Sequence, residues 1–314
     1  MNVLSVDGGG IRGVIPAMVL ANLEERTGKR TAELFDLIAG TSTGGIIALA
    51  MTVPGDDGKP RWTANDLVDL YLTEGPRIFH HSIGRLLESG LGLLDEKYDA
   101  QPLEDALKKY LGEAMISQAV TDVMVTSYDL EHRKPFFFKT DRAKVKPEHD
   151  WLMREAARAT SAAPTYFEPE KLTADGEVFA LCDGGVFANN PAMSAYAEAR
   201  RRHPRAQIRL VSLGTGQLTR KLHYEEVRSW GLIRWARPLL DVVFDGVSDA
   251  TEYELAQLLP ESDYVRFQTE LIGASDSLDN ANEGNLDHLQ NLARTLINGR
   301  ASDLEQLASQ LETR

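Results

Sequence analysis

A serine flanked by glycines is the first feature of the sequence that could do chemistry. From Gly40 to Gly44 the chain reads Gly-Thr-Ser-Thr-Gly, which fits the Gly-x-Ser-x-Gly nucleophile elbow. An apolar run precedes this segment and a helix-like run follows it, so Ser42 is expected on a sharp strand-to-helix turn. Glycines suit such a turn because it leaves little room for side chains. The pattern predicts a nucleophilic Ser42, although glycine-rich turns with serine also occur for structural reasons alone.

A second glycine-rich segment, Asp7 to Gly13, lies near the N-terminus. It reads Asp-Gly-Gly-Gly-Ile-Arg-Gly and contains Gly8, Gly9, Gly10, Arg12 and Gly13. Three of these glycines match the dinucleotide-binding fingerprint, but the next strand leads into the serine turn instead of ending at a ribose-binding acid. We therefore expect the backbone N–H groups of Gly8 to Gly10 to form an oxyanion hole, with Arg12 steadying the loop or assisting electrostatically. A simple tight turn is the alternative.

An activated serine needs a base, and Asp183 is the best candidate. It follows the strand-like run Val178 to Cys182 and is followed by Gly184 and Gly185, which leave space around the carboxylate. We expect this run to be a parallel strand, whose carboxyl end is where α/β sites lie. An aspartate in an ordinary turn is the structural alternative.

None of the seven histidines follows a core strand in a glycine-rich context, so a Ser-His-Asp triad is not supported. They are His80, His81, His132, His149, His203, His223 and His288. The sequence predicts a dyad of Ser42 and Asp183 instead. A carboxylate with a pKa of about 4 is a weak base, so partial burial is expected to raise that pKa and the glycine N–H groups are expected to contribute strongly.

The sequence predicts no metal site and no cofactor. It lacks a His-Glu-x-x-His motif, and its acidic stretch from Asp276 to Asp287 does not have the spacing of a calcium loop. The single cysteine, Cys182, cannot form an intramolecular disulfide and is expected to be a small buried side chain.

Alternating short apolar runs and helical patterns predict an α/β fold with a mostly parallel central sheet flanked by helices. The expected strands are 3–6, 35–39, 122–129, 135–139, 178–182 and 208–213. The expected helices are 65–72, 103–111, 192–202, 230–244, 252–259 and 286–297. From about Glu225 the pattern consists of helices alone. We expect one domain over 1–314, with an α/β core to about residue 220 and a helical C-terminal part from about 225.

Composition and charge exclude several classes of function. The 314 residues include 34 Lys and Arg against 47 Asp and Glu, a formal net charge of −13, which disfavours nucleic acid as a partner. The same charge predicts a preference for zwitterionic or neutral lipids over anionic ones. The N-terminal residues resemble neither a signal peptide nor a membrane span, so a cytoplasmic protein with at most peripheral membrane contact is expected.

Two apolar segments could contact lipid. The segment Pro76 to Leu94 could form a flap over an acyl groove, or equally a loop and helix packed on the core. The tryptophans Trp230 and Trp235 could lie at a lipid interface, but a packed helix or a dimer contact is the favoured interpretation. The oligomeric state is not predicted.

Taken together and in this order, the three glycine-rich motifs resemble those of the patatin family of lipid acyl hydrolases. The segments Thr160 to Phe167, Leu213 to Gly216 and Trp230 to about Ile297 also look like the corresponding segments of plant patatins, so the resemblance covers nearly the whole chain. Departures are small: Gly185 stands where plant patatins have alanine, and their signal peptide has no counterpart.

The resemblance implies a three-layer patatin-like fold and hydrolysis of glycerolipid acyl esters, of the phospholipase A, lysophospholipase or galactolipase type. Ser42 would be the nucleophile, Asp183 its acid/base partner, and Gly8, Gly9, Gly10 and Arg12 the oxyanion hole. An acyl-enzyme forms and no calcium is required. The partners implied are a lipid or acyl-ester substrate and, transiently, a membrane or micelle surface. Alternatives are an effector that degrades membranes on a signal and, less favoured, a phosphate-binding module that uses the Asp7 to Gly13 loop.

Overall fold

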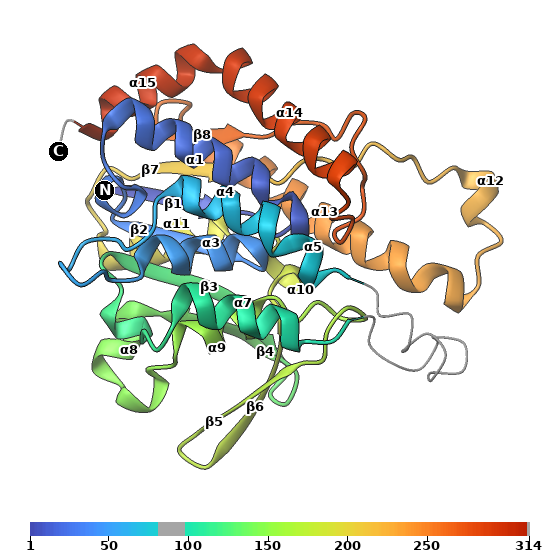
Figure 1. Cartoon of the computed structure of the whole chain (residues 1–314), viewed down its shortest axis with the longest axis horizontal. Coiled ribbons are helices and arrows are strands. Elements are labelled where there is room, and N and C mark those ends of the chain that lie inside the picture. Colours follow the sequence, from blue (N-terminus) through green and yellow to red (C-terminus); the bar gives the residue numbers. More distant parts are fainter. Residues whose placement is uncertain (81–97, 313–314) are drawn as a thin grey trace.

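The fold is built on one eight-stranded sheet in a computed structural model that describes residues 1–80 and 98–312 (Figure 1). The strand order is β5-β6-β3-β2-β1-β7-β8, and β4 pairs with β3. The strands are β1 (Asn2–Val6), β2 (Leu37–Thr41), β3 (Asp122–Asp129), β4 (Lys134–Lys139), β5 (Glu170–Ala174), β6 (Glu177–Asp183), β7 (Arg209–Leu213) and β8 (Tyr264–Phe267).

Helices connect most of these strands. The α-helices up to β6 are α1 (Val14–Thr27), α2 (Thr31–Leu34), α3 (Thr43–Thr52), α4 (Ala64–Thr73), α5 (Gly75–Ile78), α7 (Gln101–Leu111), α8 (Thr140–Val145) and α9 (Met153–Thr160). Those after β6 are α10 (Gly185–Ala188), α11 (Ala192–Arg202), α12 (Tyr224–Val227), α13 (Leu232–Leu258), α14 (Glu283–Gly299) and α15 (Ala301–Glu312). Short 3-10 helices are η1 (Gly10–Gly13), η2 (Ile116–Gln118) and η3 (Pro147–His149).

The centre of the sheet is parallel, because β3, β2, β1, β7 and β8 all run the same way. β4 and β6 are antiparallel to β3, and β5 forms a hairpin with β6 that projects from the rest of the sheet (Figure 1). The mostly parallel sheet is thus confirmed. The expectation that the strand before Asp183 is parallel was wrong, because β6 pairs with β3 in the antiparallel direction, a pairing between strands distant in sequence.

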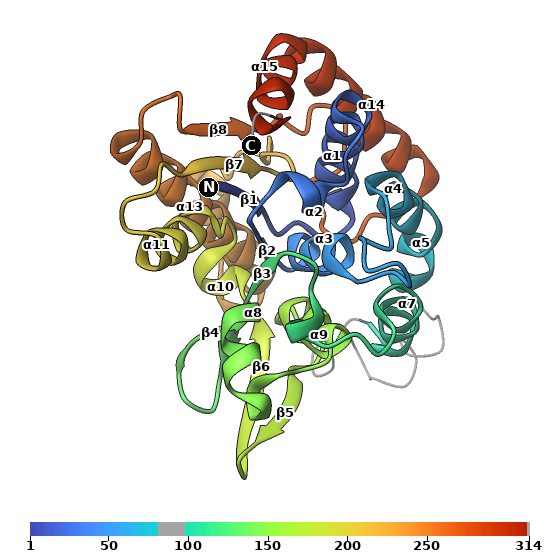
Figure 2. The same cartoon turned by 90° about the vertical axis from the view of Figure 1, so that its left-hand side faces the viewer.

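Helices cover both faces of the sheet and make three layers, as expected (Figure 2). Alternate residues of β1 point to opposite faces: Leu4 and Val6 join the core under α1 and α3, whereas Val3 joins a smaller core under α11. Packed side chains therefore exclude water from both faces of the central strands, and every residue of β1 and β2 is buried.

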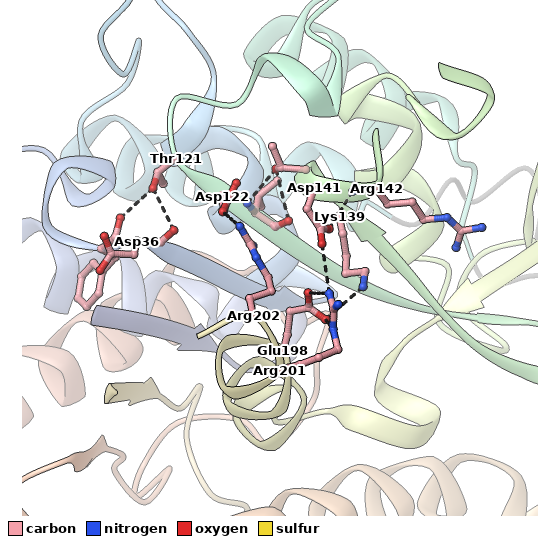
Figure 3. Close-up of polar contacts among 12 residues, drawn as sticks. Asp36, Thr121, Asp122, Lys139, Asp141, Arg142, Glu198, Arg201 and Arg202 are labelled. Carbon is pink, nitrogen blue, oxygen red and sulfur yellow. Dashed lines mark hydrogen bonds and ion pairs between the residues drawn. The ribbon is translucent and has the colours of Figure 1, made fainter. Parts of the chain in front are cut away.

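Ion pairs fix α11 against the sheet (Figure 3). Glu198 contacts Lys139 of β4 at 3.2 Å and Arg201 at 2.5 Å, and Arg201 also contacts Asp141 at 3.3 Å. Arg202 pairs with Asp122, the first residue of β3, at 2.5 Å. These ion pairs join the C-terminal half of α11 to the start of β3, the end of β4 and the start of α8.

The C-terminal part is mainly helical, but the expectation of helices alone was wrong at Tyr264–Phe267. This strand, β8, pairs with β7 in parallel and extends the sheet. Its four residues are too few for a recognisable alternation, so only the long-range pairing identifies it. The two helices expected from 230 to 259 are one helix, α13, with Pro238 inside it. Helices α14 and α15 lie over α1 (Figure 1).

No helix in the described ranges is long and apolar enough to cross a membrane. Most of the predicted flap segment, Pro76 to Leu94, lies outside the described residues. Its beginning belongs to α5, where Ile78 is buried.

Candidate active site

Ser42 stands on a sharp turn between β2 and α3, as the motif predicts. Its backbone has φ of 54° and ψ of −124°, a conformation that side-chain-bearing residues rarely adopt. Its N–H donates to Thr160 Oγ1 at 2.8 Å, and its carbonyl accepts the N–H of Ile46 at 3.1 Å. The hydroxyl is therefore carried on a strained but well anchored turn.

The two flanking glycines are required by close backbone contacts. A Cβ atom at Gly40 would lie 2.0 Å from the carbonyl oxygen of Gly44, and one at Gly44 would lie 2.1 Å from the carbonyl oxygen of Val6. The turn can thus pack against the end of β1 only because both positions lack side chains.

Asp183 lies at the end of β6 with 1% of its surface exposed. Its Oδ1 atom accepts the N–H of Gly185 at 2.7 Å, and its own N–H donates to the carbonyl of Ala162 at 2.9 Å. Its Oδ2 atom makes no hydrogen bond of normal geometry with the described residues. Burial raises the pKa of Asp183 to about 7, while contacts with Ser42 and with the Gly185 N–H act to lower it. A carboxyl group with this pKa can exchange a proton near neutral pH.

Side-chain hydrogen bonds hold two carbonyl groups of the glycine loop after β1. Thr215 Oγ1 donates to the carbonyl of Gly8 at 2.6 Å, and Arg12 Nε donates to the carbonyl of Gly9 at 3.2 Å. In a trans peptide the N–H points opposite to the carbonyl, so the N–H groups of Gly9 and Gly10 are turned the other way. Neither is bonded to another described residue, whereas the N–H of Gly8 donates to the carbonyl of Asn189 at 2.9 Å. This geometry offers two donors, from Gly9 and Gly10, and removes Gly8 from the predicted donor set.

Arg12 is 6% exposed and belongs to the support of this loop. Both its backbone N–H and its Nε atom donate to Gly9, at 3.2 Å each. Its guanidinium group does not line the cavity that contains Ser42. Arg12 is thus placed to orient the loop, one of the two roles considered for it.

The remaining predicted glycines lie where neighbouring side chains approach the backbone. A Cβ atom at Gly13 would lie 2.4 Å from Thr43 Oγ1, and one at Gly184 would lie 2.1 Å from Thr126 Oγ1. A Cβ atom at Gly185 would lie 3.0 Å from the Phe244 ring, so alanine there demands only a small adjustment.

Ser42, Asp183, Gly9 and Gly10 share one cavity with mainly apolar walls. The other lining residues are Ile11, Thr43, Ile46, Leu70, Tyr71, Gly75, Ile78, Phe79, Leu103, Ser161, Ala163, Tyr166, Phe167, Phe244 and Leu278. Aliphatic and aromatic walls beside the Ser42 hydroxyl suit an ester with a hydrocarbon acyl chain.

No histidine of the described part of the chain lines this cavity. His132 instead contacts the buried Asp129 at 2.5 Å, at the turn between β3 and β4. The described ranges contain no group of three or more His, Cys, Asp or Glu side chains arranged to hold a metal ion. Cys182 is buried, and burial raises the pKa of its thiol to about 11.

Three further residues position the site and were not assigned these roles from the sequence. Thr160 anchors the Ser42 turn and also donates to the carbonyl of Thr126 at 2.6 Å. Thr215 and Asn189 hold the glycine loop through the carbonyl and N–H of Gly8. Thr215 lies in a glycine-rich turn after a predicted strand. This pattern indicates that Thr215 lies at the end of a strand, but it does not identify the Gly8 carbonyl as its hydrogen-bond partner.

Comparisons with known proteins show which family the chain is similar to. A family model described as Patatin-like phospholipase matches residues 4–196. Patatin-like protein 2 of Arabidopsis thaliana is 34% identical over 336 aligned residues, which cover 95% of this chain and 83% of that protein. Patatin group J-1 of Solanum tuberosum is 32% identical and covers 95% and 84%, respectively. Among solved structures, VipD from Legionella pneumophila matches with a TM-score of 0.40 and 10% identity, covering 94% of this chain and 66% of that one.

Proposed function

Because the chain belongs to the patatin-like phospholipase family and is a lipid acyl hydrolase, we propose that it cleaves glycerolipid acyl esters with a dyad of Ser42 and Asp183. One observation carries the proposal. A serine on a strained elbow shares an apolar cavity with a buried carboxyl group whose pKa is raised to about 7. The substrates would be esters of the phospholipase A, lysophospholipase or galactolipase type.

Acylation uses groups that are all present in the cavity. Ser42 Oγ attacks the ester carbonyl carbon while the Asp183 carboxylate takes the hydroxyl proton. The oxyanion of the tetrahedral intermediate accepts hydrogen bonds from the N–H groups of Gly9 and Gly10. When the intermediate collapses, the bond to the glycerol oxygen breaks, and that oxygen takes the proton from Asp183. The deacylated lipid leaves and the acyl group stays on Ser42.

Deacylation repeats these steps with water. Asp183 removes a proton from water as its oxygen attacks the acyl carbonyl, and the same two N–H groups hold the oxyanion. The bond to Ser42 Oγ then breaks, the proton returns to Ser42, and a fatty acid is released. Every charge that develops is matched by a protein group, so the proposal requires no calcium.

The experiment is to measure fatty-acid or p-nitrophenol release from phosphatidylcholine micelles and from a p-nitrophenyl ester, with excess chelator present. The parent chain is compared with Ser42→Ala and Asp183→Ala. We expect activity to survive the chelator and to fall at least about a thousandfold in both variants.

Asp129→Asn is the matched control, because Asp129 is also a buried strand carboxylate but contacts His132 and does not line the cavity. Its activity should remain within a few fold of the parent. Loss of the parent activity on chelation, or its survival in Ser42→Ala, would contradict the proposal.

A further inference from the structure

Ser161 lines the cavity at Ser42 with a hydroxyl group that no described residue engages. The residue is 9% exposed, and its Oγ atom is buried without a hydrogen-bond partner in the described ranges. Its backbone is fully bonded, because its N–H donates to the carbonyl of Ala157 at 3.2 Å and its carbonyl accepts the N–H of Ala163 at 2.9 Å. A buried hydroxyl group without a partner is uncommon in proteins and calls for an explanation.

Other hydroxyl residues at helix ends in this chain bond the helix itself. Thr27, Thr52 and Thr73 are each the last residue of a helix, and each donates its hydroxyl proton to the carbonyl four residues earlier, at 2.7 to 3.0 Å. Ser161 directly follows the last residue of α9, but its Oγ atom does not bond the carbonyl of Ala157. The hydroxyl group is therefore available to a molecule inside the cavity.

Ser161 lies between the residues that anchor the two members of the proposed dyad. Thr160, the residue before it, accepts the N–H of Ser42 at its Oγ1 atom, at 2.8 Å. The carbonyl of Ala162, the residue after it, accepts the N–H of Asp183 at 2.9 Å. The Oδ1 atom of Asp183 is bonded to a backbone N–H, so Oδ2 is the oxygen that can exchange a proton. Among the described residues that line the cavity, Asp183 Oδ2 and Ser161 Oγ are the two buried side-chain atoms without a hydrogen-bond partner.

We propose that Ser161 is a further catalytic residue, whose hydroxyl group holds the leaving oxygen of the ester during acylation and the attacking water during deacylation. The two oxygens occupy the same place beside Asp183, because its carboxyl group gives a proton to the first and takes one from the second. The inference rests on the proposed function, because it takes Ser42 to be the nucleophile.

A hydroxyl group suits both steps, since it can donate and accept. In acylation the Ser161 hydroxyl donates to the alcohol oxygen while the bond from that oxygen to the carbonyl carbon breaks and Asp183 protonates it. In deacylation it accepts one O–H of water, while Asp183 takes the proton of the other O–H as the water oxygen attacks the acyl carbonyl. Ser161 keeps its own proton throughout, and the products are the alcohol and the fatty acid.

The experiment compares two esters that share an acyl group, ethyl butyrate and p-nitrophenyl butyrate. p-Nitrophenolate leaves without a proton or a hydrogen bond, whereas ethoxide needs both. For Ser161→Ala we expect kcat/KM to fall about tenfold for ethyl butyrate, as for one lost hydrogen bond, and to change less than about threefold for p-nitrophenyl butyrate. Stopped-flow release of p-nitrophenol should show a burst, followed by deacylation about tenfold slower than in the parent.

Ser5→Ala is the matched control, because Ser5 is also a buried serine whose Oγ atom lacks a described partner, but it lies in β1 and does not line the cavity. Its rates with both esters should stay within a few fold of the parent. Ser161→Cys separates shape from hydrogen bonding, because a thiol fills a similar space but is a weak donor and acceptor. It should behave like Ser161→Ala, and recovery of the parent rates in this variant would overturn the proposal.

An equal loss with both esters in Ser161→Ala would indicate a packing role and overturn the proposal, as would unchanged rates with both. These outcomes leave ester hydrolysis at Ser42 intact. Failure of the proposed function is seen separately: a parent chain without activity, or without an acyl group on Ser42 in mass spectrometry, contradicts the dyad itself and with it the role of Ser161.

Discussion

Ser42 and Asp183 approach each other from opposite directions along one edge of β3. β2 pairs with β3 up to Thr41 and Thr126, and β6 pairs with β3 from Asp183 and Ser127. β4 pairs with β3 residues that also pair with β2 or with β6, so β4 lies on one edge of β3 and both β2 and β6 lie on the opposite edge. On that edge β2 and β6 end beside consecutive residues of β3. The proposed nucleophile and the Asp183 carboxylate are therefore joined through the backbone of a central strand, which fixes their separation.

The pH dependence of activity should follow Asp183. Because the pKa of this carboxyl group is raised to about 7 and the base must be ionised, kcat/KM for a p-nitrophenyl ester should rise tenfold per pH unit below that value and level off above it. Initial rates from pH 5 to pH 9 would show this. A profile that is flat down to about pH 5 would mean that Asp183 ionises like an ordinary aspartate or is not the base.

The same shift should make the free energy of unfolding depend on pH. Between the ordinary aspartate pKa of 3.8 and about 7, the folded chain holds a proton on Asp183 that the unfolded chain has released, so this contribution to stability is lost as pH rises. The loss is at most about 1.4 kcal/mol per pH unit in that window. Asp183→Asn should thus gain stability relative to the parent as pH rises from 4 to 8, which urea unfolding at several pH values would measure. A gain that shrinks with rising pH would contradict the assignment.

Strain at Ser42 predicts a difference in stability between two variants of this residue. Glycine adopts φ of 54° with ψ of −124° more readily than alanine does, so Ser42→Gly should be more stable than Ser42→Ala by about 1 kcal/mol. Thermal or urea unfolding of the two variants gives the comparison. The order of stability should reverse at Ile46, inside the following helix α3, where replacement by glycine should be more destabilising than replacement by alanine.

Thr215 should influence catalysis without touching the substrate. Thr215→Val removes the 2.6 Å hydrogen bond to the Gly8 carbonyl that orients the N–H of Gly9. We expect kcat to fall about tenfold or more with KM little changed, and Thr215→Ser, which retains the hydroxyl, to restore most of the rate. Steady-state kinetics on a soluble ester separate the two constants. An equal loss in both variants would indicate a packing role only.

The buried ion pair of Asp7 and Arg266 should be essential for stability. Arg266 contacts Asp7 at 2.7 Å with both side chains under 10% exposed, and it also bonds Ser212 at 2.6 Å. Arg266→Met leaves an unpaired buried carboxylate and should cost about 3 to 5 kcal/mol in urea unfolding at neutral pH. Adding Asp7→Asn should recover part of the loss.

The exposed pair of Arg228 with Glu225, 58% and 73% exposed, is the control for that prediction. Arg228→Met should change the free energy of unfolding very little, because solvent screens such pairs. If Arg266→Met and Arg228→Met lowered the free energy of unfolding equally, the burial of Arg266 would not explain the loss of stability.

The sequence by itself determined the segments proposed to carry the chemistry and most of the elements that support them. The glycines at 40 and 44 could be recognised because the backbone approaches that require them are local to one turn and its neighbouring strand. The strands β1, β2, β3 and β7 were predictable because burial on both faces leaves short, continuous apolar runs.

Only the tertiary structure decided how these segments meet. Local pattern does not encode the direction of β6, the pairing of β8 or the hydrogen bond that the Gly8 N–H donates to the carbonyl of Asn189, because each depends on a partner distant in sequence. The raised pKa of Asp183 likewise comes from desolvation inside the assembled cavity, which no isolated Asp-Gly-Gly segment can provide. Residue type thus set which groups can react, and long-range packing set their separation, orientation and protonation.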